Sequence, residues 1–313
     1  MTDPDPANPA RAIALKLASI LLFTIMAALI KIGREVVPTG EAVFFRSLFA
    51  LPPILIWAAW QGRLTEAFRV NDRFAHLNRG LIGVAAMGCG FAALGLLPLP
   101  EVIAIGYAAP LIATALAALI LRERVRAFRW TAVAVGLLGV IVMLWPRLTL
   151  LGSGEVTDTQ ALGAWIALVG AFLVALATVH IRRLTRTETT LSIVFWFTVI
   201  CTLASLVTLP FGWVWPGGWT ALILVAAGLF GGTAQMLMTE SYRQADASTL
   251  APMEYSSMVY GLAIGYLVFA EIPGFSVLIG ASIVIAAGVL IIWRERRLGL
   301  DNARARAART PQG

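Results

Sequence analysis

Two stretches decide the fold of this chain: GYAAPLIATALAALILRE at residues 106–123 and EYSSMVYGLAIGYLVFAE at residues 254–271. Sliding the sequence by 148 positions aligns them, so that Tyr107 meets Tyr255 and Glu123 meets Glu271. Both stretches are mostly apolar, and both end in a glutamate at a short hairpin before a Gly- and Ala-rich run. The register therefore indicates a duplicated helical unit.

The composition places this duplicated unit in a membrane. Of the 313 residues, 59% are hydrophobic and 13% are charged, and the mean hydropathy is +0.84. Soluble domains contain about a quarter charged residues, so this excess of apolar residues is too large for a water-soluble core. Cys89 and Cys201 both fall inside apolar runs. They predict neither a disulfide framework nor a metal site.

Runs long enough to cross a bilayer as a helix, about 20 apolar residues each, occur ten times along the chain. They cover residues 12–32, 41–60, 74–96, 100–121, 128–146, 161–182, 190–211, 219–242, 247–270 and 274–293. The offset of 148 maps the fourth run onto the ninth and the fifth onto the tenth. We predict an all-α membrane protein of ten transmembrane helices, built as two five-helix repeats over 12–146 and 161–293.

Five is an odd number, so the second repeat enters the membrane from the opposite side, as in the inverted repeats of secondary transporters. Lys and Arg are retained in cytoplasmic loops. One side collects most of these residues, namely arginines 63, 69, 73, 79, 122, 124, 126, 129, 182, 183, 186 and 243 and the arginines of the C-terminal tail. We therefore expect cytoplasmic tails at 1–11 and 294–313, an external linker at 147–160, and no nucleic-acid partner. The basic tail is read as an anchor beside anionic lipid.

Several motifs follow one another in an order that resembles the EamA-type members of the drug/metabolite transporter superfamily. The resemblance covers residues 12–293, and its motifs in chain order are AALIKIG, FFRSLFALPP, GYAAPLI, LRERV, GLLGVIVML, FAEIP and GASIVIAAGVLII. It implies a carrier of small organic solutes, similar to amino-acid exporters of the YddG type, in a bacterial inner membrane. The chain departs from the family pattern at Trp196, and at APMEY around Pro252. Both departures touch the expected cavity, so the resemblance assigns no substrate.

The function expected from these observations is alternating-access transport of an amino acid or an amino-acid-like zwitterion, with export favoured. Uptake of a larger metabolite such as riboflavin or S-adenosylmethionine is the alternative, and a membrane-embedded enzyme is a remote one. Nucleotide-binding and hydrolase motifs are missing from the sequence. We therefore expect no enzymatic activity, no cofactor and no ATPase subunit. The expected partners of a monomeric chain are its substrate and membrane lipid.

Glu254 is the one carboxylate well inside a predicted span, and it is the leading candidate site residue. An ionised acid at the bilayer centre costs about 2.5–3.5 kcal/mol on insertion scales, so it is expected to face the bundle interior. The functional interpretation is substrate-amine binding or proton coupling. The structural alternative is a buried ion pair or a protonated carboxyl group. On a continuous helix, Ser257 and Met258 would share its face.

Other polar and aromatic residues are weaker candidates for the cavity wall. Tyr107, Tyr255, Trp196 and Gln235 are candidates for substrate contact, although packing is the commoner role of aromatic residues. Arg46 is expected either to bind a substrate carboxylate or to form a structural salt bridge to Glu41 or Glu101.

Five further residues are assigned structural roles. Lys31 is expected to anchor the outer end of the first span, and Glu123 and Glu271 to bond helix ends at their hairpins. Pro110 and Pro252 are expected to kink the helices that line the cavity, because proline removes a backbone hydrogen bond.

Overall fold

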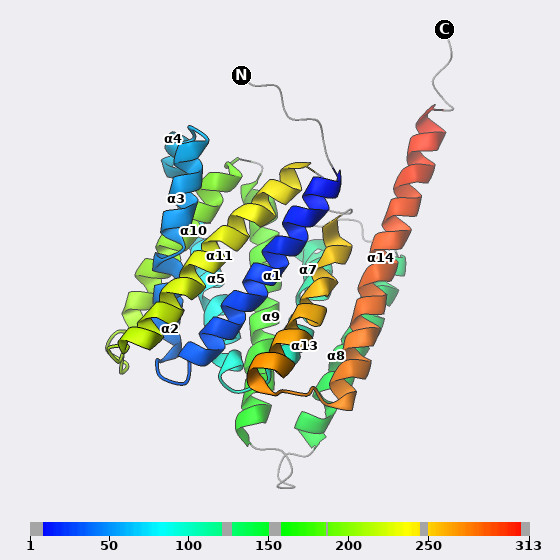
Figure 1. The fold of residues 1–313 in the computed structure, drawn as a ribbon. Helices are drawn as coiled ribbons and strands as arrows, with labels where there is room; N and C mark the ends of the chain where they lie inside the picture. Colours follow the sequence, from blue (N-terminus) through cyan, green and yellow to red (C-terminus); the bar gives the residue numbers. More distant parts are fainter. Residues whose placement is uncertain (1–8, 121–126, 150–157, 186, 245–249, 308–313) are drawn as a thin grey trace.

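The computed structural model describes residues 9–120, 127–149, 158–185, 187–244 and 250–307. Within these residues every regular element is a helix. Figure 1 shows a bundle of long helices in which α1 begins and α14 ends at the same end. We call this end the terminal face and the other end the opposite face. Two ends on the same side of the bundle agree with an even number of membrane spans.

Two of the expected spans of the first half are broken within the bundle. The elements of this half are α1 (Pro9–Gly33), α2 (Thr39–Leu48), α3 (Leu51–Trp60), α4 (Leu64–Phe68), α5 (Arg73–Leu94), α6 (Leu99–Gly106), α7 (Ala108–Ile120) and α8 (Ala127–Thr149). The second span is divided into α2 and α3, and the fourth into α6 and α7.

The second half repeats this order. Its elements are α9 (Asp158–Leu184), α10 (Thr190–Ser205), the 3₁₀ turn η1 (Leu206–Thr208), α11 (Gly218–Gln244), the 3₁₀ turn η2 (Ala251–Tyr255), α13 (Ser256–Phe269) and α14 (Phe275–Ala307). The ninth expected span is thus divided into η2 and α13.

In the part of the chain that the structure describes, seven helical segments are long and apolar enough to cross a membrane. Shorter apolar segments lie in α8, at Trp130–Trp145, and in α14, at Phe275–Leu290. The structure therefore supports a membrane-embedded helical bundle, and the count of ten spans stays a prediction.

The duplication is visible in how the helices pack. Helix α14 begins at Phe275, 148 positions after α8 begins at Ala127. The most extensive contact in the bundle joins α1 to α11, and the matching contact joins α9 to α5. The first helix of each half thus packs on the third helix of the other. Helices α8 and α14 run antiparallel (Figure 1), as an inverted repeat requires.

Glycines at matching positions allow a second pair of equivalent contacts, α5 with α10 and α11 with α2. Gly80 and Gly83 of α5 lie against side chains of α10, and Gly228 and Gly231, 148 positions later on α11, lie against α2. Helices in lipid associate through close van der Waals contact, because lipid tails are as apolar as their side chains. Both halves therefore use glycines at equivalent positions to bring neighbouring helices close together.

Helix breaks fall beside prolines. Pro110 lacks the N–H that would bond to Gly106 four residues earlier, and the fourth span breaks between these two residues, at Tyr107. In the ninth span, Pro252 belongs to η2 and the α-helix begins only at Ser256. The expectation that Glu254 lies within a continuous α-helix is therefore wrong, since it lies in the 3₁₀ turn before α13.

One further sequence expectation differs from the structure. Arg79, assigned to a loop, lies inside α5, six residues after its start. Helix α14 continues beyond the predicted span to Ala307, and the solvated basic tail stays a prediction. The alanines and arginines of this segment are strong helix formers, which favours continuation of the helix beyond the apolar run.

Buried apolar side chains form clusters that join the two halves. One cluster joins α6, α7, α8 and α9 to α13 and α14, and includes Tyr107 and Met258. A second joins α1, α2 and α5 to α11. Both contain residues of the two halves, so neither half has a complete core of its own.

The crossing of α8 and α14 provides a test of this packing. A Cβ atom added at Gly139 would lie 2.8 Å from the carbonyl oxygen of Gly280 and 2.9 Å from Val284 Cγ2. We expect Gly139→Ala to cost roughly 1–3 kcal/mol of stability through overpacking, and to lower the Tm of the purified protein by several degrees.

The matched control is Gly88→Ala in the interior of α5, where a Cβ atom would meet nothing within 4 Å. This variant should keep or slightly raise the Tm, because alanine is the better helix former. Equal Tm values for the two variants would contradict the close crossing at Gly139.

Candidate functional site

An ion pair joins the two halves of the molecule near the terminal face. Lys16 of α1 donates through Nζ to Oε1 of Glu254 in η2. The Lys16 side chain is 1% exposed, whereas that of Glu254 is 49% exposed. One partner is thus enclosed by the bundle, and the other retains an accessible side.

This pairing follows from the cost of charge in a membrane. A lysine at the centre of a span costs about 2.5–3.5 kcal/mol on insertion scales, so such residues face the interior and pair there. Lys16 lies seven residues after the start of α1, and η2 packs against α1. Glu254 therefore supplies a counter-charge from the second half to a buried cation of the first.

A hydroxyl cluster lies beside the ion pair. Tyr107 Oη is 2.7 Å from Ser257 Oγ and 3.3 Å from the carbonyl oxygen of Tyr255. The Ser257 hydroxyl in turn donates to the carbonyl oxygen of Glu254 at 2.6 Å. Ser256 Oγ is buried without a hydrogen-bond partner among the described residues. Adjacent residues of η2 and α13 thus gather a carboxylate and hydroxyl groups.

Tyr107 and Tyr255 show where this cluster lies in the fold. They are 148 positions apart, so they are equivalent in the repeat, and their rings meet edge to face at 5.4 Å. Equivalent residues of two repeats touch only close to the symmetry axis that relates the repeats. The site therefore lies at the junction of the two halves, and transporters built from repeats bind their substrates there.

The Tyr255 ring is held between the two halves. Its hydroxyl group occupies the position that a Cβ atom would take at Gly288 of α14. Met258 is buried in the apolar cluster that also contains Tyr107. The structure thus brings together five predicted site residues, namely Tyr107, Glu254, Tyr255, Ser257 and Met258.

The other three predicted substrate contacts lie elsewhere. Arg46 and Gln235 line a narrow crevice between α2, α3, α10 and α11. Trp196 packs edge to face on Phe195 at 5.6 Å. Glu41, one of the expected partners of Arg46, instead accepts a hydrogen bond from the Val214 backbone N–H at 3.0 Å.

A second ion pair lies toward the opposite face, between Lys31 and Glu271 at 2.9 Å. Lys31 also donates to the carbonyl oxygens of Leu94 and Leu97, at 3.1 and 2.6 Å. Glu271 accepts a bond at 2.7 Å from the N–H of Leu99, the first residue of α6. Lys31 is therefore tied to helix ends, and Glu271 bonds a helix of the other half.

The two remaining structural predictions concern residues with limited description. Glu123 lies outside the described residues, and for Pro252 only the backbone turn is described. Sequence reasoning missed Lys16, although its signal was present. The chain contains two lysines, Lys16 and Lys31, and both lie on α1 within one apolar run.

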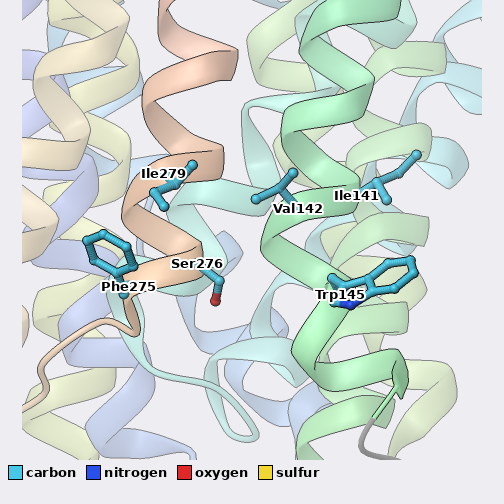
Figure 2. A pocket seen from close by; sticks show the side chains of 6 residues that line it. All are labelled: Ile141, Val142, Trp145, Phe275, Ser276 and Ile279. Carbon is cyan, nitrogen blue, oxygen red and sulfur yellow. The ribbon is translucent and has the colours of Figure 1, made fainter.

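An apolar groove between α8 and α14 is a different kind of cavity. It has a volume of about 320 Å³ and is lined by Ile141, Val142, Trp145, Phe275, Ser276 and Ile279. Figure 2 shows these side chains between and beside the two helices. The groove's polar groups are the Ser276 hydroxyl and the Trp145 indole N–H, so the groove offers little to orient a polar solute. Among the described residues, no cluster of His, Cys, Asp and Glu could hold a metal ion.

The fold and the site together define a class: a helical membrane protein with a duplicated unit and a charged site between its two copies. The EamA-like transporter family model matches residues 10–145 and again residues 161–293. The chain therefore belongs to the EamA-like transporter family.

Curated relatives of this chain are transporters of several solutes. It is 26% identical to the S-adenosylmethionine uptake transporter of Rickettsia prowazekii, over 82% of this chain and 84% of the relative. It is 27% identical to the pseudopaline exporter CntI of Pseudomonas aeruginosa (90% and 93%) and to the riboflavin transporter of Rhizobium johnstonii (83% and 83%).

The same fold occurs in a solved crystal structure. The match has a TM-score of 0.64 at 20% identity, and it covers 92% of this chain and 99% of that one. At this level of identity the likeness shows the fold alone.

The unequal burial of the ion pair predicts unequal effects of its two neutral variants. Glu254→Gln takes this carboxylate from the buried Lys16, and we expect a loss of about 2 kcal/mol or more, because removing one partner of a buried ion pair is strongly destabilising. Lys16→Gln leaves a half-exposed carboxylate that water can solvate. We expect this second variant to lose less, as measured by thermal unfolding of the purified protein.

The double variant Lys16→Gln/Glu254→Gln should be more stable than Glu254→Gln alone, since it buries no charge at this position. If Lys16→Gln is the more damaging single change, the assignment of the buried partner is wrong.

Proposed function

We propose that this protein is a secondary transporter of amino acids or amino-acid-like zwitterions, and that it binds their head group between Lys16 and Glu254. The observation that carries the proposal is this ion pair between the halves, with one buried and one accessible partner. An ammonium and a carboxylate are the two groups that complement the charges of an α-amino acid.

The accessible side of Glu254 is central to this reading. Lipid tails do not solvate a carboxylate, so its exposed side is expected to face a water-filled space. A substrate ammonium that enters there meets Glu254 first. The substrate carboxylate then takes over the Lys16 ammonium, so that two new ion pairs replace one and no charge is left buried without a partner.

The hydroxyl groups beside the pair suit the neutral part of such a substrate. Tyr107 and Ser257 already bond to each other, and the hydroxyl group of Ser256 is buried beside them. A site at the junction of the halves also fits alternating access, in which one unit rocks against the other around a fixed site. Binding at Lys16 and Glu254 touches both units at once.

The relatives support a broader range of substrates. S-adenosylmethionine carries an amino-acid head group, so the same two charges can recognise it, and the Rickettsia uptake transporter favours it as a second candidate. Riboflavin has no such head group, so the riboflavin transporters among the relatives favour a carrier of a different chemistry. The relatives include both importers and an exporter, so the direction of transport is left open.

The expected setting is a bacterial inner membrane, with both termini in the cytoplasm. Helix α4, which Arg63 and Arg69 flank, lies at the face where α1 begins and α14 ends (Figure 1), and Arg183 lies at the end of α9. Retention of positive charge on the cytoplasmic side assigns the terminal face to the cytoplasm. As a secondary transporter, the protein would need no ATPase subunit.

The test is flux into proteoliposomes without ATP, using labelled amino acids, S-adenosylmethionine and riboflavin. We expect flux of one or more solutes that carry an amino-acid head group. For that solute, Glu254→Gln and Lys16→Gln should each reduce flux at least tenfold, which corresponds to about 1.4 kcal/mol of lost interaction.

The matched control is Glu66→Gln, which removes a carboxylate from an ion pair with Arg63 outside the spans, at 2.6 Å. The bond to Glu66 raises the pKa of Arg63, and its loss should leave flux unchanged. Flux of riboflavin alone, or wild-type flux in the Glu254→Gln variant, would contradict the proposal.

A further inference from the structure

Helices α6 and α13 pack closely between the site at Glu254 and the opposite face. Helix α13 runs from this site toward the opposite face (Figure 1), and its glycines Gly261 and Gly265 are buried against α6. A Cβ atom added at Gly261 would overlap Ile103, and one added at Gly265 would lie 2.9 Å from Pro100 Cγ. Packing this close leaves no room for a solute between the two helices.

The ion pair between Lys31 and Glu271 lies at the end of this contact. Lys31 of α1 donates to the carbonyl oxygen of Leu94, the last residue of α5, and to that of Leu97 in the hairpin that follows. The carboxylate of Glu271, just after α13, lies 2.9 Å from Lys31 Nζ and accepts a bond from the N–H of Leu99 at the start of α6. The pair therefore ties the end of α13 to three helices of the first half.

The turn that carries Glu271 is strained. Ala270 ends α13 with a φ of 53°, in the left-handed region that favours glycine, and it is the one non-glycine residue with a positive φ in the described part of the chain. The N–H of Glu271 bonds to the carbonyl oxygen of Gly265 at 2.9 Å, which turns the chain back toward α6. Backbone strain of this kind persists where the surrounding structure enforces it, and it is concentrated at binding and switching segments.

The two ends of this path differ in accessibility. The Glu254 side chain, near the terminal face, is 49% exposed. The side chains of Lys31 and Glu271, toward the opposite face, are 16% and 17% exposed. The structure is therefore accessible at the site from the side of the terminal face, and it is enclosed toward the opposite face.

We propose that the Lys31–Glu271 pair is a latch, which holds the opposite face closed and breaks when the site becomes accessible from that face. In alternating access one half rocks against the other, so that a single site is reached from each face in turn. The latch joins one residue of each half, so movement of the halves apart at this face must break it. Lys31 lies near the end of its span, where a long side chain can reach water once the pair is broken.

The inference rests on the alternating access proposed above, and it does not depend on the identity of the substrate. The experiment measures how fast a thiol reagent that cannot the membrane cross reacts with a cysteine placed behind the latch. The probe is Ile103→Cys, in a chain whose two free cysteines are removed by Cys89→Ala and Cys201→Ala. Right-side-out vesicles present the opposite face to the reagent, and inside-out vesicles present the terminal face.

We expect Glu271→Gln and Lys31→Met each to speed the labelling of the probe about tenfold in right-side-out vesicles, which corresponds to a shift of about 1.4 kcal/mol between the closed and open states. Each variant removes one partner of the latch, so either one carries the test if the other fails to fold. The matched control is Glu66→Gln, which breaks an ion pair at the terminal face and should leave the labelling rate unchanged.

An unchanged labelling rate in the latch variants overturns the inference. A rise confined to inside-out vesicles, or an equal rise in the Glu66→Gln control, also overturns it. Labelling requires no substrate, so this result is distinct from that of the flux assay. Absence of amino-acid flux would contradict the proposed substrate and would leave the labelling result standing.

Discussion

The rest of this structure depends on the electrostatic cost of a lysine inside a membrane bundle. Lys16 is enclosed by the helices, and it is tied to Glu254 of the other half. Lys31, the chain's second lysine, is tied to Glu271 toward the opposite face. Both lysines lie on α1, and both glutamates flank α13. Two ion pairs therefore hold one helix of each repeat together near both ends of the bundle.

The interface between α9 and α7 is equivalent in the repeat to the interface between α1 and α13, but it has a different chemistry. The positions equivalent to Lys16 and Lys31 are Ala164 and Val179 of α9, and both are buried and apolar. Helix α9 packs more extensively on α7 than α1 does on α13. One interface between the halves is thus held by close apolar packing, and the other by charges that a charged solute can replace. An apolar interface can open only by losing its packing contacts. An ion pair can open without such a loss when a charged solute takes the place of one partner.

Much of this architecture could be predicted from the sequence. The shift of 148 positions identified the repeat, and Tyr107 and Tyr255, matched in that register, do meet in the structure. The apolar run around Glu254 marked this residue as unusual. Its partner, Lys16, could not be identified in the same way, because the pairing depends on the tertiary contact between η2 and α1. The 3₁₀ turn was missed because apolar periodicity does not distinguish a broken helix from a continuous one. Arg79 was assigned to a loop by its charge, although burial against Phe197 accommodates it inside α5.

The central claim is that one solute satisfies Lys16 and Glu254 together. The most direct measurement compares ligand-induced changes in Tm of the wild-type protein for three matched compounds. These are an α-amino acid, the amine that lacks its carboxyl group, and the acid that lacks its amino group. The account predicts a rise in Tm with the amino acid and little with the other two, because each of them leaves one protein charge without a counterpart. An equal rise with the amine or the acid alone would contradict it.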